Sequence, residues 1–289
     1  MKPAPFDYVA PATLDDAIGA LATAGDDAKI LAGGQSLIPM LALRLARPAV
    51  LVDINRLRGL DGIREGAGIL EIGALVRQRA LERWAAGRSP LFAEVLQAVA
   101  HPPIRNRGTV VGNIVHADPA SELPAIALAL GARFHARTAT QQRWIAASDF
   151  FVSALTTDLK PDEMLVEIEL PSPKPRTGCC FMEIARRRGD FAIVGVAAMM
   201  TLGEQDECAD VRLSFCGVGE TPVDASSAAN VLVGRAPSED AIRDVAAIVQ
   251  TMIAPNGSVH ATADYQRHIA GVLTERALQT AYARGRDGH

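Results

Sequence analysis

Three prolines within five positions interrupt the chain at Pro171-Ser172-Pro173-Lys174-Pro175. Proline fixes its backbone angle φ and donates no backbone hydrogen bond, so this stretch cannot lie inside a helix and is disfavoured in a central strand. The chain has 289 residues, which exceeds the usual size of one domain. We therefore predict an N-terminal domain of residues 1–175, divided into subdomains of about 1–55 and 56–175, and a C-terminal domain of residues 176–289.

Hydrophobic periodicity predicts short strands and helices throughout the N-terminal part. Thr13 is a typical N-cap, the apolar residues that follow it recur at helical spacing, and Gly25 ends that helix. In residues 165–170 apolar residues alternate with glutamates, the pattern of a strand with one exposed face. Further strands are expected at residues 6–9, 28–31, 49–54 and 69–73, and helices at residues 37–45, 76–86 and 91–100.

Beyond the proline-rich break the pattern changes to strands followed by helices. Apolar runs at residues 180–185, 194–202 and 211–218 predict three strands. Two amphipathic helices follow, one capped by Ser238 and one over residues 263–283. This order is typical of helices packed on an antiparallel sheet, so we predict a C-terminal three-stranded antiparallel sheet with a helical bundle in an α+β chain.

Charge and composition exclude several classes of protein. The net charge is −4 and the arginines are scattered, so we expect no binding to nucleic acid. Even the apolar run at residues 194–202 is far shorter than the roughly 20 residues that span a bilayer, and residues 1–8 lack the pattern of a signal peptide. We therefore expect no membrane span and a cytoplasmic location.

The four cysteines are Cys179, Cys180, Cys208 and Cys216, and no two of them have C-x-x-C spacing. They cannot by themselves supply the clustered thiolates that usually hold [2Fe-2S] centres. We interpret them as free, buried or partly buried thiols in a reducing compartment.

Two glycine-containing segments are candidates for binding an anion. The first, Ala32-Gly33-Gly34-Gln35-Ser36, lies between a predicted strand and a predicted helix, where backbone N–H groups can turn toward a phosphate. The second, residues 106–113, repeats glycines beside Thr109 and Asn113 about 75 residues later. Each alone is compatible with an ordinary tight turn, whereas together they could hold the two phosphates of a dinucleotide.

The polar stretch at residues 114–124 follows directly and is expected to be a loop that shapes a ligand site. His116 and Asp118 lack a second His or Cys at ligand spacing, so we expect no metal site there. Asp118 and Glu122 are expected to cap local backbone or to accept hydrogen bonds from ligand hydroxyls.

Other nucleotide and hydrolase motifs are absent from the sequence. The glycine pairs at residues 66–68 and 217–219 lack the third glycine of G-x-G-x-x-G, and neither opens a convincing βαβ unit. The chain also has no Walker A loop and no G-x-S-x-G nucleophile elbow. Rossmann, NTPase and hydrolase functions are therefore disfavoured.

Three motifs in order resemble the FAD-binding medium subunits of the xanthine dehydrogenase and carbon monoxide dehydrogenase family. That family carries an A-G-G-x-S loop, a T-x-G-G-(N/S) loop followed by A-(D/S)-P-x-x-(D/E)-L, and an A-R-R-x-x-D-(F/I/Y)-A stretch. The counterparts here are residues 32–36, residues 109–122, and Ala185-Arg186-Arg187-Arg188-Gly189-Asp190-Phe191-Ala192. The resemblance covers nearly the whole chain.

The resemblance implies the two-subdomain FAD-binding flavoprotein fold of the molybdenum hydroxylase medium subunit, with a C-terminal domain packed against the cofactor site. It implies that the two glycine-containing segments bind the diphosphate, that Glu122 hydrogen-bonds the cofactor, and that Val99 and Leu165 pack on it. Phe191 is placed near the flavin ring, and the alternative is a core aromatic residue. The implied cofactor-binding residues are Leu31, Ala32, Gly33, Gly34, Gln35, Ser36, Leu37, Val99, Gly108, Thr109, Val111, Gly112, Asn113, Ala117, Glu122, Leu165 and Phe191.

Two positions depart from the family pattern. Val111 replaces the first glycine of the T-x-G-G loop, so the approach of that backbone to phosphate is expected to differ. Met182 stands where some relatives have a cofactor-contacting lysine, so that contact should be absent or replaced. The run from Arg186 to Arg188 could provide positive charge instead, or could face solvent or another subunit.

By this resemblance, FAD in this chain relays electrons from [2Fe-2S] clusters of a small partner subunit to an external acceptor. A large partner subunit would carry the molybdenum cofactor, and the complex is expected to be a dimer of heterotrimers. We expect no catalytic residue acting on the organic substrate and no metal ligand in this chain; its part is to position the flavin and tune its potential.

Two alternatives remain open at the level of sequence. A stand-alone FAD-dependent oxidase would turn over its own substrate as an isolated chain. A non-catalytic assembly or ligand-binding module that has lost FAD would be colourless, and Val111 is the only hint of it.

Overall fold

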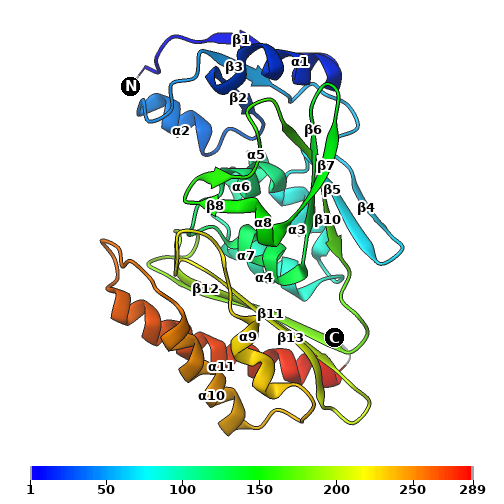
Figure 1. Cartoon of the computed structure of the whole chain (residues 1–289), viewed down its shortest axis with the longest axis vertical. Coiled ribbons are helices and arrows are strands. Elements are labelled where there is room, and N and C mark those ends of the chain that lie inside the picture. Colours follow the sequence, from blue (N-terminus) through cyan, green and yellow to red (C-terminus); the bar gives the residue numbers. More distant parts are fainter. Residues whose placement is uncertain (1, 288–289) are drawn as a thin grey trace.

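The computed structural model describes residues 2–287, and its first unit is a small parallel sheet flanked by helices (Figure 1). Strands β1 (Asp7–Val9), β2 (Ala28–Leu31) and β3 (Val50–Asp53) pair in the order β1-β3-β2. Because β2 and β3 are parallel, their carboxyl ends lie at the same edge of the sheet. The helical segments of this unit are α1 (Leu14–Ala24), the 3₁₀ turn η1 (Gly25–Asp27) and α2 (Leu37–Ala42).

Local signals explain where α1 begins and ends. The side chain of Thr13 accepts a hydrogen bond from the backbone N–H of Asp16, which satisfies one unpaired donor of the first turn. Gly25 follows the last residue with φ +54°, a conformation that favours glycine. Both predicted ends of this helix are confirmed.

The second unit contains a five-stranded antiparallel sheet in the order β4-β5-β10-β6-β7. The prediction of a strand at residues 165–170 is confirmed, and its glutamates lie on the less buried face. The strands are β4 (Ile63–Gly66), β5 (Ile69–Gly73), β6 (Arg133–Arg137), β7 (Gln142–Ala146) and β10 (Met164–Pro171), with a separate hairpin of β8 (Phe151–Ser153) and β9 (Thr156–Thr157). The helices are α3 (Gln78–Ala85), α4 (Pro90–Ala98), α5 (Pro102–Arg107), α6 (Val110–His116), α7 (Glu122–Leu130) and α8 (Ala147–Phe150).

The third unit follows the proline-rich break, which begins at Pro171, the last residue of β10, and ends before β11 (Thr177–Ala185). Its sheet has four antiparallel strands where the sequence predicts three, because the two-residue strand β14 (Val223–Asp224) adds to the edge of β13 (Cys208–Cys216). So short a strand leaves no periodic pattern to detect. The remaining elements are β12 (Ala192–Leu202), α9 (Ser226–Ala229), the 3₁₀ turn η2 (Asn230–Leu232), α10 (Glu239–Met252) and α11 (Ala263–Asp287).

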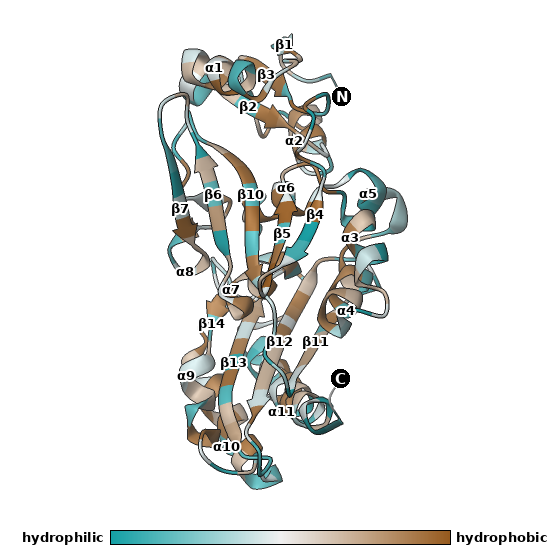
Figure 2. Ribbon diagram, turned by 90° about the vertical axis from the view of Figure 1, so that its right-hand side faces the viewer, coloured by the Kyte–Doolittle hydropathy of each residue, from teal (hydrophilic) through white to brown (hydrophobic). Residues whose placement is uncertain are grey.

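The C-terminal sheet lies between two helical layers (Figures 1 and 2). Helix α11 packs on β11 and β12 from one side, with α10 beside it, while α4 and α7 of the second unit cover the other side. Alternate residues of β12 therefore enter two different cores: Ala197 and Met199 join the core of the first two units, and Val196, Ala198 and Met200 join that of α10 and α11. Burial on both faces explains the nearly continuous apolar run.

A polar clamp joins the C-terminal sheet to α4. Glu94 accepts a hydrogen bond from the backbone N–H of Phe181 at 2.9 Å and forms an ion pair with Arg284 of α11. Arg284 also donates to the carbonyl oxygen of Cys179 at 2.6 Å. One carboxylate thus fixes a helix, a strand and the C-terminal helix relative to one another.

No helix within residues 2–287 combines the length and the apolar character that crossing a membrane requires.

Candidate functional site

The first glycine-containing segment connects the carboxyl end of β2 to helix α2. Gly34 has φ +72°, and a Cβ there would lie 3.1 Å from the side chain of Ile38, so this turn favours glycine on two grounds. Of the backbone N–H groups from Gly33 to Leu37, none donates a hydrogen bond to another group within residues 2–287. A run of free donors at the carboxyl ends of parallel strands is a typical place for an anionic ligand.

The second segment is mostly helical, which corrects the predicted loop. Only Gly108 and Thr109 separate α5 from α6, and α6 continues to His116 through part of the stretch expected to be a loop. Thr109 caps α6 by accepting a hydrogen bond from the N–H of Gly112 at 3.1 Å. Val110, Val111 and Ile114 bury one face of this helix, and their packing outweighs the low helix propensity of β-branched residues.

The two segments lie in direct backbone contact. A Cβ built on Gly33 would be 2.6 Å from the carbonyl oxygen of Arg107, 2.7 Å from Cα of Gly108 and 2.9 Å from the nitrogen of Thr109. Real Cβ atoms do not approach other atoms so closely, so only glycine fits at position 33. The convergence that the sequence predicts is therefore present in the structure.

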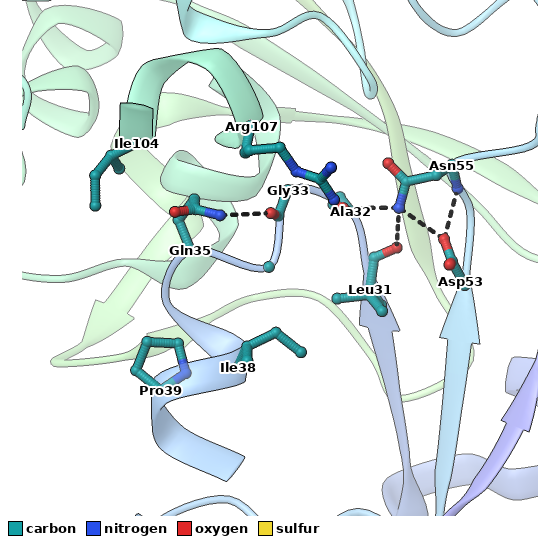
Figure 3. Close-up of a pocket in the computed structure, with 11 residues that line it drawn as sticks. Leu31, Ala32, Gly33, Gln35, Ile38, Pro39, Asp53, Asn55, Ile104 and Arg107 are labelled. Atoms are coloured by element: carbon teal, nitrogen blue, oxygen red, sulfur yellow. Dashed lines mark hydrogen bonds between the residues drawn. The ribbon is translucent and has the colours of Figure 1, made fainter. Parts of the chain in front are cut away.

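A cavity of about 410 Å³ opens beside this contact (Figure 3). Leu31, Ala32, Gly33, Gly34 and Gln35 of the predicted set line it. Sequence reasoning missed most of the rest of its wall. Asp53 is the last residue of β3 and Asn55 follows it, at the sheet edge where β2 also ends. Ligands typically bind at the carboxyl ends of parallel strands, so this rule could have found both residues. The residues missed are Ile38, Pro39, Asp53, Asn55 and Ile104, while Arg107 lies in the second predicted segment but was not singled out as a binding residue.

Positive charge gathers beside the cavity. The guanidinium of Arg107 lies near Ala32 and Gly33 in Figure 3. Burial, together with the nearby charge of Arg107, lowers the pKa of Arg77. Burial would raise the pKa of Asp53, but hydrogen bonds from Tyr8 and from Asn55 outweigh it and keep that pKa below its ordinary value. Two neighbouring cations beside free N–H groups favour an anion such as a diphosphate.

Most other predicted residues lie outside the wall of this cavity, on α2, α4, α6 and β10 or at their ends. Ser36 and Leu37 begin α2, and Gly112 and Asn113 lie in the first turns of α6. Ala117 ends α6 with φ +51°, in the left-handed region that is uncommon for alanine. Val99 ends α4 and Leu165 lies on β10, and both are buried. Asn113 accepts a hydrogen bond from Ser121 at 2.7 Å.

Val111 does not obstruct the cavity. Its side chain is 3% exposed, belongs to the hydrophobic core, and is absent from the wall of the cavity. The Cβ that replaces a glycine of the family pattern therefore fills core space and does not enter the cavity.

Glu122, which is buried, and Glu183, which is half-buried, form an acidic pair at the junction of the second and third units. Glu122 begins α7 and is 5% exposed; burial, with the nearby charge of Glu183 and Asp118, raises its pKa to about 8. Burial raises the pKa of Glu183 on β11 to about 7, and its Oε2 atom is buried without a hydrogen-bond partner. Sequence reasoning gave no signal for Glu183, because its burial arises only when the sheet docks on α7.

A second cavity of about 410 Å³ lies beside Glu183. Its wall includes Gln97 and Ala98 at the end of α4 and the arginine run at residues 186–188. Phe191 lies in the same loop, which connects β11 to β12. Its side chain is 70% exposed, so the alternative of a core aromatic residue is excluded. The loop is held against the end of α4 because Gly189 packs on His101, and Arg188 donates to Gln97 at 3.1 Å.

No group of three or more His, Cys, Asp or Glu side chains within the described part of the chain is arranged to hold a metal ion. All four cysteines are buried and free, and burial raises the pKa of each thiol. The thiols are therefore poor nucleophiles at neutral pH.

Two family models together match nearly the whole chain. Residues 4–173 match the model of the FAD binding domain in molybdopterin dehydrogenase, and residues 179–281 match the CO dehydrogenase flavoprotein C-terminal domain. The 6-hydroxypseudooxynicotine dehydrogenase complex subunit alpha of Paenarthrobacter nicotinovorans is 39% identical, over 99% of this chain and 97% of that protein. The carbon monoxide dehydrogenase medium chain of Afipia carboxidovorans is 35% identical over 99% of this chain and its own full length.

Solved structures agree with this placement. A carbon monoxide dehydrogenase chain from Hydrogenophaga pseudoflava superposes with a TM-score of 0.94 at 36% identity, and the match covers 98% of this chain and 99% of that one. A chain of quinoline 2-oxidoreductase from Pseudomonas putida 86 superposes with a TM-score of 0.92 at 35% identity, covering 99% of both chains.

Proposed function

This chain belongs to the family of FAD-binding medium subunits of xanthine dehydrogenase and carbon monoxide dehydrogenase enzymes, and on that premise we propose that it relays electrons between a partner's iron-sulfur clusters and an external acceptor. It is a subunit of an oxidoreductase complex. Family membership covers the FAD-binding subunit itself. The electron relay, the partner's [2Fe-2S] clusters and the external acceptor are what we propose in addition.

The observation that carries the proposal is the contact between Gly33 and residues 107–109 beside the first cavity. It brings the free N–H groups of residues 33–37 and the guanidinium of Arg107 to one place. A diphosphate needs this combination of donors and positive charge. The residues present therefore fit FAD, and Val111, the one hint of a chain that has lost it, lies outside the cavity wall.

When bound, FAD supplies a ring that accepts electrons singly or in pairs, which suits transfer between a one-electron cluster and a two-electron acceptor. The protein's own residues supply position and local charge. The two glycine-containing segments hold the diphosphate, and Val99 and Leu165 provide buried apolar contact. Glu122 keeps its proton at neutral pH because its pKa is about 8, so its carboxyl can donate a hydrogen bond to the cofactor.

The names of the relatives support a multi-subunit assembly. Relatives covering nearly the whole chain are called medium chains or subunits of dehydrogenase complexes, and one solved relative is a Cu,Mo-containing carbon monoxide dehydrogenase. We place this chain beside a small iron-sulfur subunit and a large molybdenum subunit, as a dimer of heterotrimers in the cytoplasm. The substrate of such a complex would be determined by the large subunit.

The test is to purify the chain with its co-expressed neighbours and to record the visible absorption spectrum. We expect a flavin spectrum, together with small and large subunits that co-purify. Mixing the FAD-loaded chain with a chemically reduced iron-sulfur subunit should then bleach the flavin absorbance without any organic substrate. A colourless chain would favour the non-catalytic module, and turnover of an organic substrate by the isolated chain would favour the stand-alone oxidase.

A further inference from the structure

We propose that Asn55 and Arg77 are positioning residues that hold the two glycine-containing segments at the spacing which the cofactor's diphosphate requires. The inference rests on the proposed FAD site and assigns a role to two residues outside the sequence motifs. Asn55 contacts Ala32 of the first segment and Arg77 contacts Arg107 of the second, and these two contacted residues lie 75 positions apart in the chain. Fixing them by side-chain hydrogen bonds is therefore a long-range restraint.

Asn55 is bound to the first segment through its amide nitrogen. Its Nδ2 atom lies 2.8 Å from the carbonyl oxygen of Ala32, 3.3 Å from that of Leu31 and 2.7 Å from Oδ1 of Asp53, so its two N–H groups donate to these three acceptors with one N–H shared (Figure 3). All three partners only accept hydrogen bonds, so the amide can lie in only one orientation. Asp53 fixes the same residue again by accepting from the backbone N–H of Asn55 at 2.9 Å.

The amide oxygen of Asn55 is then left to face Arg77. Nη2 of Arg77 donates to Oδ1 of Asn55 at 2.6 Å, and Nη1 donates to the carbonyl oxygen of Arg107. Through Asn55, the planar guanidinium thus joins Ala32 at the start of the first segment to Arg107 at the start of the second. A lysine at this position presents a single nitrogen in place of the fork and cannot bridge both acceptors with the same geometry.

The backbone of Arg77 is independently fixed to the second segment. The N–H of Gln78 donates to the carbonyl oxygen of Gly108 at 2.9 Å, and the N–H of Val110 donates to that of Val76 at 3.0 Å. These two bonds form an isolated antiparallel bridge between Arg77 and Thr109. Arg77 is therefore attached to the second segment by its main chain, and only its side chain reaches the first segment through Asn55.

The position of Arg77 indicates that it affects the cavity through the residues it holds and not by direct contact. Arg77 is absent from the wall of the first cavity, whereas its partners Asn55 and Arg107 both line it. Within the described residues the guanidinium of Arg77 donates to two neutral oxygens, those of Arg107 and Asn55, and Asp53 acts on it only as a nearby charge. Binding sites need their donors held within about 0.5 Å, and this linkage provides such a restraint.

The experiment measures FAD affinity in the full-length chain after removal of its cofactor, by quenching of flavin fluorescence. Arg77→Ala and Asn55→Ala should each weaken FAD binding by about 10- to 100-fold, the usual consequence of losing hydrogen bonds to charged or buried groups. Arg83→Ala is the matched control, because Arg83 is an exposed residue of the same helix α3 and should leave the affinity unchanged.

Two conservative variants separate positioning from charge. Arg77→Lys keeps the charge and should recover only part of the affinity; full recovery would overturn the positioning role. Asn55→Asp keeps the size and the bond to Arg77, but it places oxygen against three acceptors and should bind FAD as weakly as Asn55→Ala. The cofactor-free variants are compared by circular dichroism and thermal unfolding, so that only variants folded like the parent are scored.

The outcomes also separate this inference from the proposed function. If the parent chain does not bind FAD, the proposed function fails. If the parent binds FAD and the folded variants bind it equally well, with an unchanged visible circular dichroism of the flavin, only the positioning role fails. Weaker binding with an altered flavin signal in the Asn55 and Arg77 variants, but not in Arg83→Ala, supports it.

Discussion

Gly33 and Gly108 lie so close that a Cβ added to Gly33 would fall 2.7 Å from Cα of Gly108. The same Cβ would meet the carbonyl oxygen of Arg107 and the nitrogen of Thr109, all of them backbone atoms that cannot swing aside. Two segments far apart in sequence are therefore packed main chain to main chain beside a cavity lined by free N–H groups and an arginine. This contact places both glycine-containing segments beside one cavity.

Gly33→Ala should separate the two segments and weaken FAD binding. Overpacking of this kind costs about 1–3 kcal/mol, so we expect FAD affinity to fall by roughly 5- to 150-fold, measured by fluorescence titration. Gly19→Ala is the control, because a Cβ at Gly19 in α1 meets no atom within 4 Å. That substitution should leave affinity unchanged and raise the free energy of unfolding slightly. Equal FAD affinity in both variants would contradict the assigned contact.

Val111→Gly restores the family pattern but should destabilise the protein. The side chain of Val111 is buried in α6, so its loss leaves a cavity and places glycine in a helix. We expect the free energy of unfolding to fall by about 2–4 kcal/mol in urea titrations. FAD affinity should change little, since Val111 is not part of the cavity wall. A large gain in affinity would show that the valine does obstruct the diphosphate.

The acidic pair predicts how stability depends on pH. Burial raises the pKa of Glu122 to about 8 and that of Glu183 to about 7, from an ordinary 4.5. Between the ordinary pKa of 4.5 and the raised pKa of each group, the folded chain retains a proton that the unfolded chain has lost. These two groups therefore lower the free energy of unfolding as pH rises from about 5 to about 8. Each contributes a slope of up to about 1.4 kcal/mol per pH unit.

The measurement compares urea unfolding of the cofactor-free parent with Glu122→Gln and Glu183→Gln across that pH range. Glutamine cannot ionise, so each variant should show a flatter decline, and the stability difference from the parent should grow toward alkaline pH. Parallel curves for parent and variants would mean that the two carboxyls ionise normally in the folded chain.

Phe191 should affect the flavin without affecting the fold. It is 70% exposed, so Phe191→Ala should change the free energy of unfolding by no more than about 0.5 kcal/mol. Phe150→Ala, at a fully buried aromatic residue, should cost about 3–5 kcal/mol and serves as the contrast. In the FAD-loaded chain, Phe191→Ala should shift the visible absorption of the flavin. An unchanged spectrum would remove Phe191 from the ring environment.

Elements with strong local signals were predictable from the sequence. Thr13, Gly25 and Ser238 mark helix ends by their own chemistry, and the structure places helix termini at all three. The long strand β12 is visible because burial on both faces makes a continuous apolar run. The first glycine-containing segment was found for the same reason, since only local backbone freedom had to be recognised.

Features created by tertiary packing were not predictable in this way. Residues 110–116 form a helix because their apolar face is buried, against the propensity of two valines and an isoleucine. Asn55 and Arg77 have roles only once β3, α3 and the second segment are adjacent. The unpartnered oxygen of Glu183 arises where the C-terminal sheet meets α4 and α7, and no sequence window contains these elements together.

The most direct test of the account is an experimental structure of the purified complex with FAD bound to this chain. The diphosphate is expected in the first cavity, with its oxygens within hydrogen-bond distance of N–H groups from residues 33–37 and beside residues 108–112. A diphosphate bound elsewhere on the chain, or a complex whose flavin is held entirely by another subunit, would contradict it.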